Sequence, residues 1–156
     1  MDGSGTKRGI VVVGLGNSYR TDDGVGLAAA AEMEKLALPN VRVVTGIVEP
    51  MGLLEAWSGA GLAIVIDAAV ATLSVPGRIR RCTLGELVAA REGLGTHSVD
   101  VVRTHDLGQA LGRVPDALVV FTVEVADTGH GIGLTSQVAR AVPEVVRMAM
   151  AEVDRS

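Results

Sequence analysis

The sequence predicts a single α/β domain in which helices cover both faces of a mainly parallel, twisted sheet, giving three layers. Two observations predict it. Short runs of aliphatic and β-branched residues, without polar alternation, are separated by longer helical segments, and such runs are typical of strands buried on both faces. Hydrophobic residues make up 48% of the 156 residues but aromatic residues only 2%, so a core of small side chains allows helices to pack closely on a sheet.

The predicted strands and helices alternate along the chain. Strands are expected at 10–13, 41–45, 62–66 and 117–125, and an edge strand at 78–82, where charged and apolar residues alternate. Helices are expected at 24–38, 51–57, 98–111 and 134–153, with a kink or restart at Pro143. A further short helix is expected to begin at Thr83–Glu86, which has capping-box spacing. Residues 1–8 are expected to be a disordered tail ahead of one domain, 9–156.

Charge and cysteine content limit the classes of function. The net charge of −4 disfavours nucleic acid, whose binding depends on clustered Lys and Arg. We interpret the basic run Arg78, Arg80 and Arg81 as one solvated face of a strand rather than a phosphate site. The single cysteine, Cys82, is expected to be a half-buried small hydrophobe at a strand end. Neither a signal-peptide core nor a membrane-length apolar run is visible, so a cytoplasmic protein that contacts no membrane is expected.

Chemically reactive side chains follow the predicted strands at their carboxyl ends, where sites form in such folds. Gly14-Leu15-Gly16-Asn17 and Thr21-Asp22-Asp23-Gly24-Val25-Gly26 follow the first strand, Asp67 ends the third, and a later loop carries His97. Structural explanations exist for most of them: glycines permit tight turns, Asn17 can satisfy loop amides, and Asp22 or Asp23 can cap the next helix. A carboxylate that ends a buried apolar strand is harder to explain, because its desolvation is costly without a partner.

Asp23, Asp67 and His97 together form a set of two carboxylates and one imidazole from three segments. Such a set leaves coordination positions open and suits Zn²⁺, Ni²⁺ or Fe²⁺ better than Mg²⁺. The common zinc-peptidase motif HExxH and the nucleophile elbow GxSxG are both absent from the sequence.

From about Gly9 to Val153 the chain resembles the hydrogenase maturation proteases, peptidase family M52, which process the large subunit of [NiFe] hydrogenases. The resemblance rests on the two glycine-rich motifs after the first strand and on Asp67-Ala68-Ala69, Thr96-His97-Ser98 and Gly133-Leu134-Thr135. It implies a phosphorylase/hydrolase-like fold.

The same resemblance implies an endopeptidase that removes a C-terminal extension from the nickel-loaded large-subunit precursor. Asp23, Asp67 and His97 would be its metal-binding and catalytic residues, and Gly14, Gly16, Asn17 and Asp22 would contact substrate. Nickel would come largely from the substrate, and Cd²⁺ or Zn²⁺ would replace it in vitro. A carboxylate or a water on the metal would attack the peptide bond. The resemblance also implies a monomer that binds its precursor transiently.

Several residues depart from the family pattern or remain open. The loop 46–52 differs from the family's usual glycine-rich form, and Asp100 and His105 intrude in the helix after His97. We expect His105 on the helix surface rather than at the metal, and His130 is a secondary candidate for lining the cleft. The apolar stretch Met51, Leu53, Leu54 and Trp57 is interpreted as a docking surface for the precursor, with ordinary core as the alternative.

Three alternatives to a nickel-dependent protease stay open. Peptidyl-tRNA hydrolase shares the Val-Gly-Leu-Gly-Asn opening, but its histidine would fall near Asp23 and a basic surface is missing. A receiver-type signalling domain would use Asp67 for phosphorylation, but it needs a Lys that is absent between Phe121 and Gly133. A metal-binding family member that has lost proteolysis is the third. A dinucleotide-binding motif fails, because Tyr19 stands where the third glycine should be.

Overall fold

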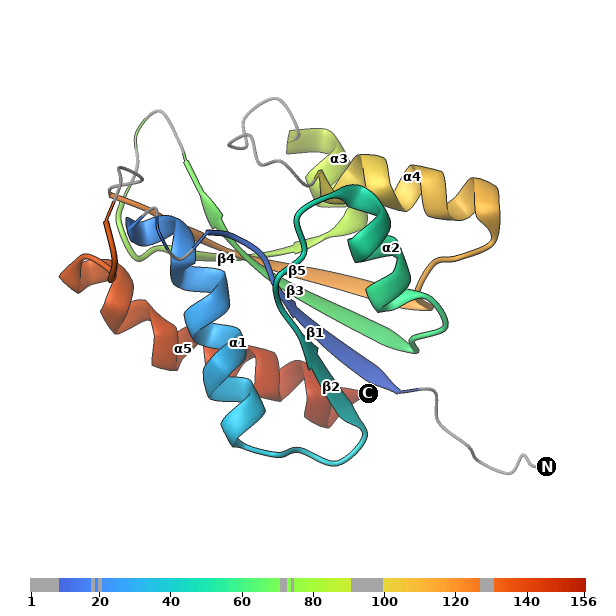
Figure 1. Ribbon diagram of the computed structural model, residues 1–156, viewed down its shortest axis with the longest axis horizontal. Helices are drawn as coiled ribbons and strands as arrows, with labels where there is room; N and C mark the ends of the chain where they lie inside the picture. The colour runs from blue at the N-terminus through green and yellow to red at the C-terminus, as the bar shows by residue number, and fades with distance from the viewer. Residues whose placement is uncertain are drawn as a thin grey trace.

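A computed structural model describes residues 9–17, 19, 21–70, 73, 75–90, 100–126 and 131–156 of the chain. Strands and helices alternate through most of these residues (Figure 1). The order is β1 (Ile10–Gly14), η1 (Thr21–Gly24), α1 (Val25–Lys35), β2 (Val41–Val44), α2 (Pro50–Trp57), β3 (Leu62–Ala69), β4 (Ile79–Thr83), α3 (Leu84–Ala90), α4 (Val101–Leu111), β5 (Ala117–Glu124) and α5 (Ser136–Arg155).

The five strands form one sheet in the order β2-β1-β3-β5-β4. Neighbouring strands are parallel except for the edge strand β4, which runs antiparallel to β5. The central strand β3 is buried along its whole length, as expected for a parallel strand covered on both faces. The predicted mainly parallel sheet in a single α/β domain is confirmed.

Helices cover both faces of the sheet, and each face has its own apolar cluster. Ile64 and Ile66 of β3 pack with α1 and α5, whereas Ala63 and Val65 pack with α2, α3 and α4. This division follows from the alternation of side chains along a strand. Figure 1 shows α1 and α5 below the sheet and the other three helices above it.

Two glycines bring α1 close to the sheet. A Cβ atom on Gly14 would lie 2.5 Å from the carbonyl oxygen of Gly26, and one on Gly26 would lie 2.3 Å from the carbonyl oxygen of Ile66. Both distances are far below van der Waals contact with rigid backbone, so only glycine fits at either position. Packing therefore explains Gly14, and the predicted substrate contact at this residue stays a prediction.

The boundaries of several elements differ from those expected. β3 continues to Ala69, three residues past the predicted end, because β5 pairs with it through Glu124. α1 ends at Lys35 rather than at residue 38, and Ala37 has a positive φ of 48°. α5 runs unbroken through Pro143, so the helix does not restart there, and the predicted kink stays a prediction. α4 begins after Asp100, whose side chain accepts the N–H of Arg103 as a helix cap.

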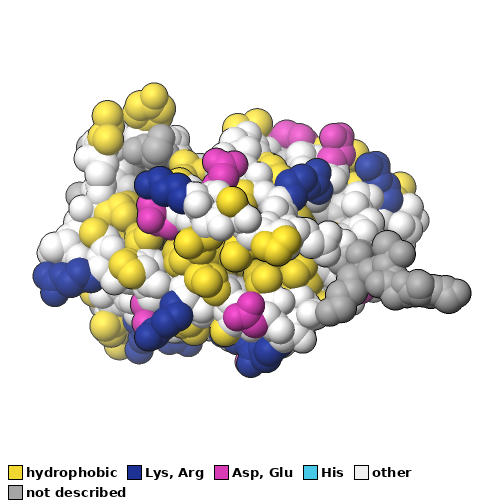
Figure 2. Space-filling model, turned by 90° about the horizontal axis from the view of Figure 1, so that it is seen from below, with side chains coloured by type: hydrophobic (Ala, Val, Ile, Leu, Met, Phe, Trp, Pro, Cys, Tyr) yellow, Lys and Arg dark blue, Asp and Glu magenta, His cyan; other side chains and the backbone are white. Residues whose placement is uncertain are grey.

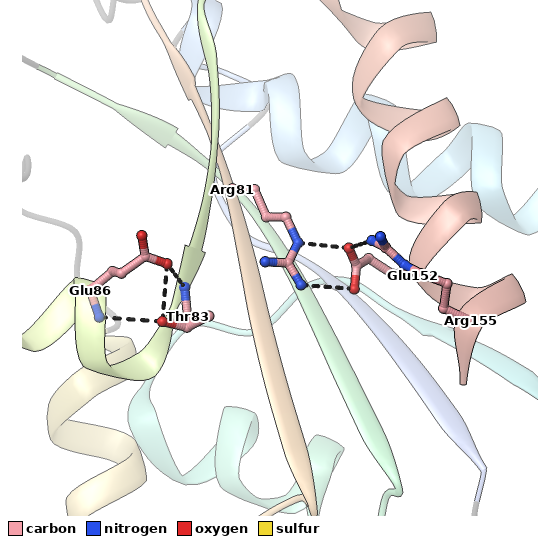
Figure 3. A network of polar contacts seen from close by, with 5 residues as sticks. All are labelled: Arg81, Thr83, Glu86, Glu152 and Arg155. Carbon is pink, nitrogen blue, oxygen red and sulfur yellow. Dashed lines mark hydrogen bonds and ion pairs between the residues drawn. The ribbon is translucent and has the colours of Figure 1, made fainter.

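Polar contacts hold the antiparallel strand β4 at its middle residue, Arg81, and at its last residue, Thr83 (Figure 3). Arg81 donates two hydrogen bonds to Glu152 of α5, at 2.7 and 3.1 Å, and Arg155 also pairs with Glu152. At the start of α3, the Glu86 carboxylate accepts the N–H of Thr83 at 2.9 Å and the Thr83 hydroxyl accepts the N–H of Glu86 at 3.4 Å. The predicted capping box is therefore confirmed.

The three arginines at positions 78, 80 and 81, in and just before β4, do not form the single solvated face that the sequence suggested. Arg78 and Arg80 pair with Glu124 on one face of the sheet, whereas Arg81 pairs with Glu152 on the other. Figure 2 shows Lys and Arg scattered among acidic and apolar side chains on the face that it draws, not gathered into a basic patch. No helix among the described residues has the length and apolarity to cross a membrane.

Glu124 should make the free energy of unfolding depend on pH in the acidic range. Its side chain is 2% exposed, and the hydrogen bonds from Arg78, together with the N–H of Val75, hold the pKa of the Glu124 carboxyl below its ordinary value despite burial. A lowered folded-state pKa gives stability that is present above the unfolded pKa, about 4.3, and is lost as pH falls through the folded pKa.

We expect the difference in urea midpoint between the wild type and Glu124→Gln to be largest near neutral pH and to shrink below about pH 4.3. Urea unfolding of both proteins from pH 7 to pH 3 measures this difference. A midpoint difference that stays constant over the range would contradict the role of Glu124. The comparison is needed because the pKa of Glu152 is also lowered, mainly by its hydrogen bond with Arg81.

Candidate functional site

The candidate site lies at the carboxyl edge of the parallel strands. β1 ends at Gly14, which is aligned with Ile66, and β3 continues for three residues beyond that point. The N–H of Leu15 donates to the carbonyl oxygen of Ile66 at 3.0 Å, so the loop after β1 starts beside Asp67. The predicted meeting of these two segments at one edge is borne out by this register.

Asp67 lies inside β3 and is 7% exposed. By strand alternation its side chain shares a face with Ala63 and Val65, which is the face covered by α2, α3 and α4. Its Oδ1 accepts the N–H of Ala68 at 2.8 Å. The segment that contains His97 joins α3 to α4, and both helices belong to this same layer.

Asp23 lies in η1, a single turn of 3₁₀-helix that contacts β3. The side chain is half-buried, and its Oδ2 accepts the N–H of Asn17 at 2.9 Å. Gly16 has a φ of 132°, and a Cβ there would lie 2.0 Å from the carbonyl oxygen of Asp23. Gly16 and Asn17 thus shape the loop that holds Asp23, and their predicted contact with substrate stays a prediction.

Asp22 has a different environment from Asp23. It is fully buried, and its carboxylate accepts the N–H of Ala126 at 2.9 Å, the N–H of Thr135 at 2.7 Å and the hydroxyl of Thr135. These bonds join the end of β5 and the start of α5 to η1. Asp22 is therefore structural in this conformation, and the N-cap residue of α1 is Gly24 rather than either aspartate.

The loops that follow β1 and β5 are joined directly. The N–H of Thr21 donates to the carbonyl oxygen of Gly131 at 3.1 Å, and the N–H of Gly131 donates to the carbonyl oxygen of Tyr19 at 3.0 Å. Together with Asp22, this pair of hydrogen bonds fixes η1 against the end of β5. The backbone around Asp23 is thus supported from two strands.

The third predicted metal-binding residue, His97, lies outside the described residues, as does His130. Within the described ranges, no three His, Cys, Asp or Glu side chains are close enough together to hold a metal ion. The donor set is consequently represented here by Asp23 and Asp67. Both are carboxylates, which are suitable ligands for a divalent ion when a neutral imidazole completes the set.

Two other side chains that could be reactive, those of His105 and Cys82, have structural roles instead. His105 is 7% exposed rather than on the helix surface, and its ring packs edge-on against Trp57 with centroids 6.0 Å apart. Cys82 is half-buried on β4, and burial raises the pKa of its thiol. A raised pKa keeps the thiol protonated and unreactive, so the interpretation of Cys82 as a small hydrophobe is confirmed.

Two polar residues near Asp67 escaped the sequence reasoning. Thr122 and Glu124 interrupt the apolar run of β5 at alternate positions, and both are buried, at 5% and 2% exposed. They share the face of Val120, which packs with α2, α3 and α4. The signal was present in the sequence, because two polar residues spaced by two in an otherwise apolar strand mark one face.

A model of the hydrogenase maturation proteases matches residues 27–152, more than half of the chain. The chain belongs to the hydrogenase maturation protease family. As a maturation protease it is a hydrolase of the endopeptidase class. This membership removes the peptidyl-tRNA hydrolase and receiver-domain alternatives. A search of curated proteins finds no match.

Solved structures of maturation proteases share the fold of this one. The hydrogenase maturating endopeptidase HYBD from E. coli superposes with a TM-score of 0.83 at 22% identity, covering 94% of this chain and 93% of that one. The [NiFe] hydrogenase maturation protease HybD from Thermococcus kodakarensis gives 0.79 at 19% identity, covering 92% and 97%. The HycI protease from Thermococcus kodakarensis KOD1 gives 0.68 at 19% identity, covering 98% and 96%.

Proposed function

We propose that this maturation protease recognises nickel already inserted in a [NiFe]-hydrogenase large-subunit precursor and then removes the C-terminal extension of that precursor. The observation that carries the proposal is the placement of Asp23 and Asp67, which come from separate segments to one carboxyl edge of the sheet. His97 is proposed as the third residue of the set. Nickel is part of the substrate here, and Cd²⁺ or Zn²⁺ would replace it in vitro.

The carboxylates of Asp23 and Asp67 are held in different ways, and both ways suit the proposed reaction. Asp23 is half-buried in a turn and held by a backbone N–H, whereas Asp67 is buried in a rigid central strand. A rigid scaffold fixes the position of the metal and so the position of the nearby peptide bond. A carboxylate at this edge can also accept a proton from a water that attacks the bond.

The loops around the site also suit a polypeptide substrate. Large apolar side chains are exposed on the loops that follow the parallel strands at this edge: Tyr19 after β1, Val48 after β2, Val70 and Leu73 after β3 and Ile132 after β5, with exposures from 50% to 85%. Exposed apolar side chains that gather at one edge of a fold can form a protein-contacting surface. We propose that they contact the precursor transiently and that the protease is a monomer.

The helix expected to dock the precursor does not have that role. Leu53, Leu54 and Trp57 of α2 are each 0% exposed and belong to the core, and only Met51 reaches the surface, at 38%. The docking interpretation of this stretch is therefore wrong. α2 turns its apolar face toward β1 and α4, as the composition of its cluster shows.

Cleavage of a purified precursor tests the proposal. We expect the wild-type protein to shorten a nickel-loaded large-subunit precursor at its C-terminus and to leave the nickel-free precursor intact, as mass spectrometry of the products would show. Equal cleavage of both forms would refute nickel recognition but keep the endopeptidase. Metal binding without cleavage of either form would favour a family member that has lost proteolysis.

A further inference from the structure

A buried hydroxyl lies beside Asp67 in the sheet. Thr122 of β5 is aligned with Asp67 of β3 in the parallel register. Aligned residues of adjacent parallel strands project to the same face, so both side chains face the layer of α2, α3 and α4. Because adjacent strands are about 4.8 Å apart, the two side chains are close enough to form a hydrogen bond with each other.

The Thr122 hydroxyl oxygen is buried and has no hydrogen-bond partner among the described residues. Thr104, which is also buried, behaves differently, because its hydroxyl donates to the carbonyl oxygen of Asp100 at 2.7 Å. An unpaired buried hydroxyl is unfavourable, and native proteins keep few of them. The hydroxyl is therefore available to a partner that the described residues do not supply.

Each of the two strands beside β5 places a charged residue next to Thr122. Arg80 of β4 is aligned with Thr122 on its other side, and the Arg80 guanidinium lies 3.6 Å from the Glu124 carboxylate. Glu124 in turn accepts hydrogen bonds from Arg78 and from the N–H of Val75. On the side of β3, the residue aligned with Thr122 is Asp67, whose carboxylate can accept more than one hydrogen bond.

We propose that Thr122 is a positioning residue whose hydroxyl donates to the Asp67 carboxylate when that carboxylate binds a metal ion. The proposal rests on the proposed function, which assigns Asp67 to the nickel of the substrate. A carboxylate that ligates a metal through one oxygen presents its other oxygen to a hydrogen-bond donor, and such donors orient the ligand. The paired strands hold both backbones in place, so the bond requires rotation of side chains only.

Calorimetric titration with Cd²⁺ tests this role in three proteins: the wild type, Thr122→Val and Thr122→Ser. Valine keeps the shape of threonine without its hydroxyl, so we expect Cd²⁺ affinity to fall roughly ten- to hundredfold, the usual loss for a missing outer partner. Serine keeps the hydroxyl and should retain affinity close to that of the wild type. The metal-free Thr122→Val protein should unfold at a temperature no lower than the wild type, because the hydroxyl has no partner to lose.

The outcomes separate this proposal from the proposed function. Equal Cd²⁺ affinity in the wild type and Thr122→Val would overturn the role of Thr122 and leave the metal site intact. Equally weak binding by Thr122→Ser and Thr122→Val would also overturn it, as would a lowered unfolding temperature of metal-free Thr122→Val, since that would reveal a structural partner. A wild-type protein that binds no Cd²⁺ would overturn the assignment of Asp67 to a metal and the Thr122 role with it.

Discussion

Replacing Asp67 with Ala is expected to abolish processing of the nickel-loaded precursor, with a loss of roughly 10²-fold or more. The reason is its position: Asp67 is fixed in the buried central strand at the carboxyl edge, so its carboxylate holds a defined place in the proposed site. The initial rate of precursor shortening measures the effect, and calorimetric titration with Ni²⁺ or Cd²⁺ shows whether metal binding is lost in parallel.

A matched control separates the loss of a site from the loss of a negative charge. Asp106 is exposed on α4, so Asp106→Ala removes one carboxylate from the surface and should leave processing unchanged. Asp67→Asn keeps the shape of the side chain but removes its charge. We expect this variant to process the precursor as poorly as Asp67→Ala does. Near-normal processing by Asp67→Ala would contradict the assignment of the site.

Replacing Asp22 with Ala is expected to cause the largest loss of stability, about 3–5 kcal/mol, because two backbone N–H groups lose a charged acceptor in the interior. Those groups belong to Ala126 and Thr135, at the end of β5 and just before α5. Their release would loosen the support of η1 and hence of Asp23. Urea denaturation of the wild type and the variant measures the free energy of unfolding.

Asp100→Ala is the control for Asp22→Ala. Asp100 is exposed and caps α4 through the N–H of Arg103, and loss of such a cap costs about 1 kcal/mol. If Asp22→Ala costs no more than Asp100→Ala, the buried carboxylate is not the structural support that its hydrogen bonds indicate. The adjacent aspartates thus differ in their expected effects: Asp22 on folding, and Asp23 on processing.

The sequence predicted some residues of the candidate site but not the roles of all of them. Asp67 was recognisable because a carboxylate after a run of buried aliphatic residues needs a partner or a function. Local pattern did not separate Asp22 from Asp23, since both precede the same helix, and only the family resemblance assigned Asp23 to the metal and Asp22 to the substrate. The difference arises from tertiary structure: Asp22 turns to backbone groups more than one hundred residues away, whereas Asp23 accepts from the nearby Asn17.

The sequence by itself determined the alternation of strands and helices, the parallel sheet, the family and the segments that carry the candidate site, because these depend on local patterns and motifs. Only the tertiary structure decided that α2 is core, that Arg78 and Arg81 pair on opposite faces, and that Thr122 lies beside Asp67. Register and burial result from contacts between distant segments, and no local pattern specifies which residue of β5 will align with Asp67.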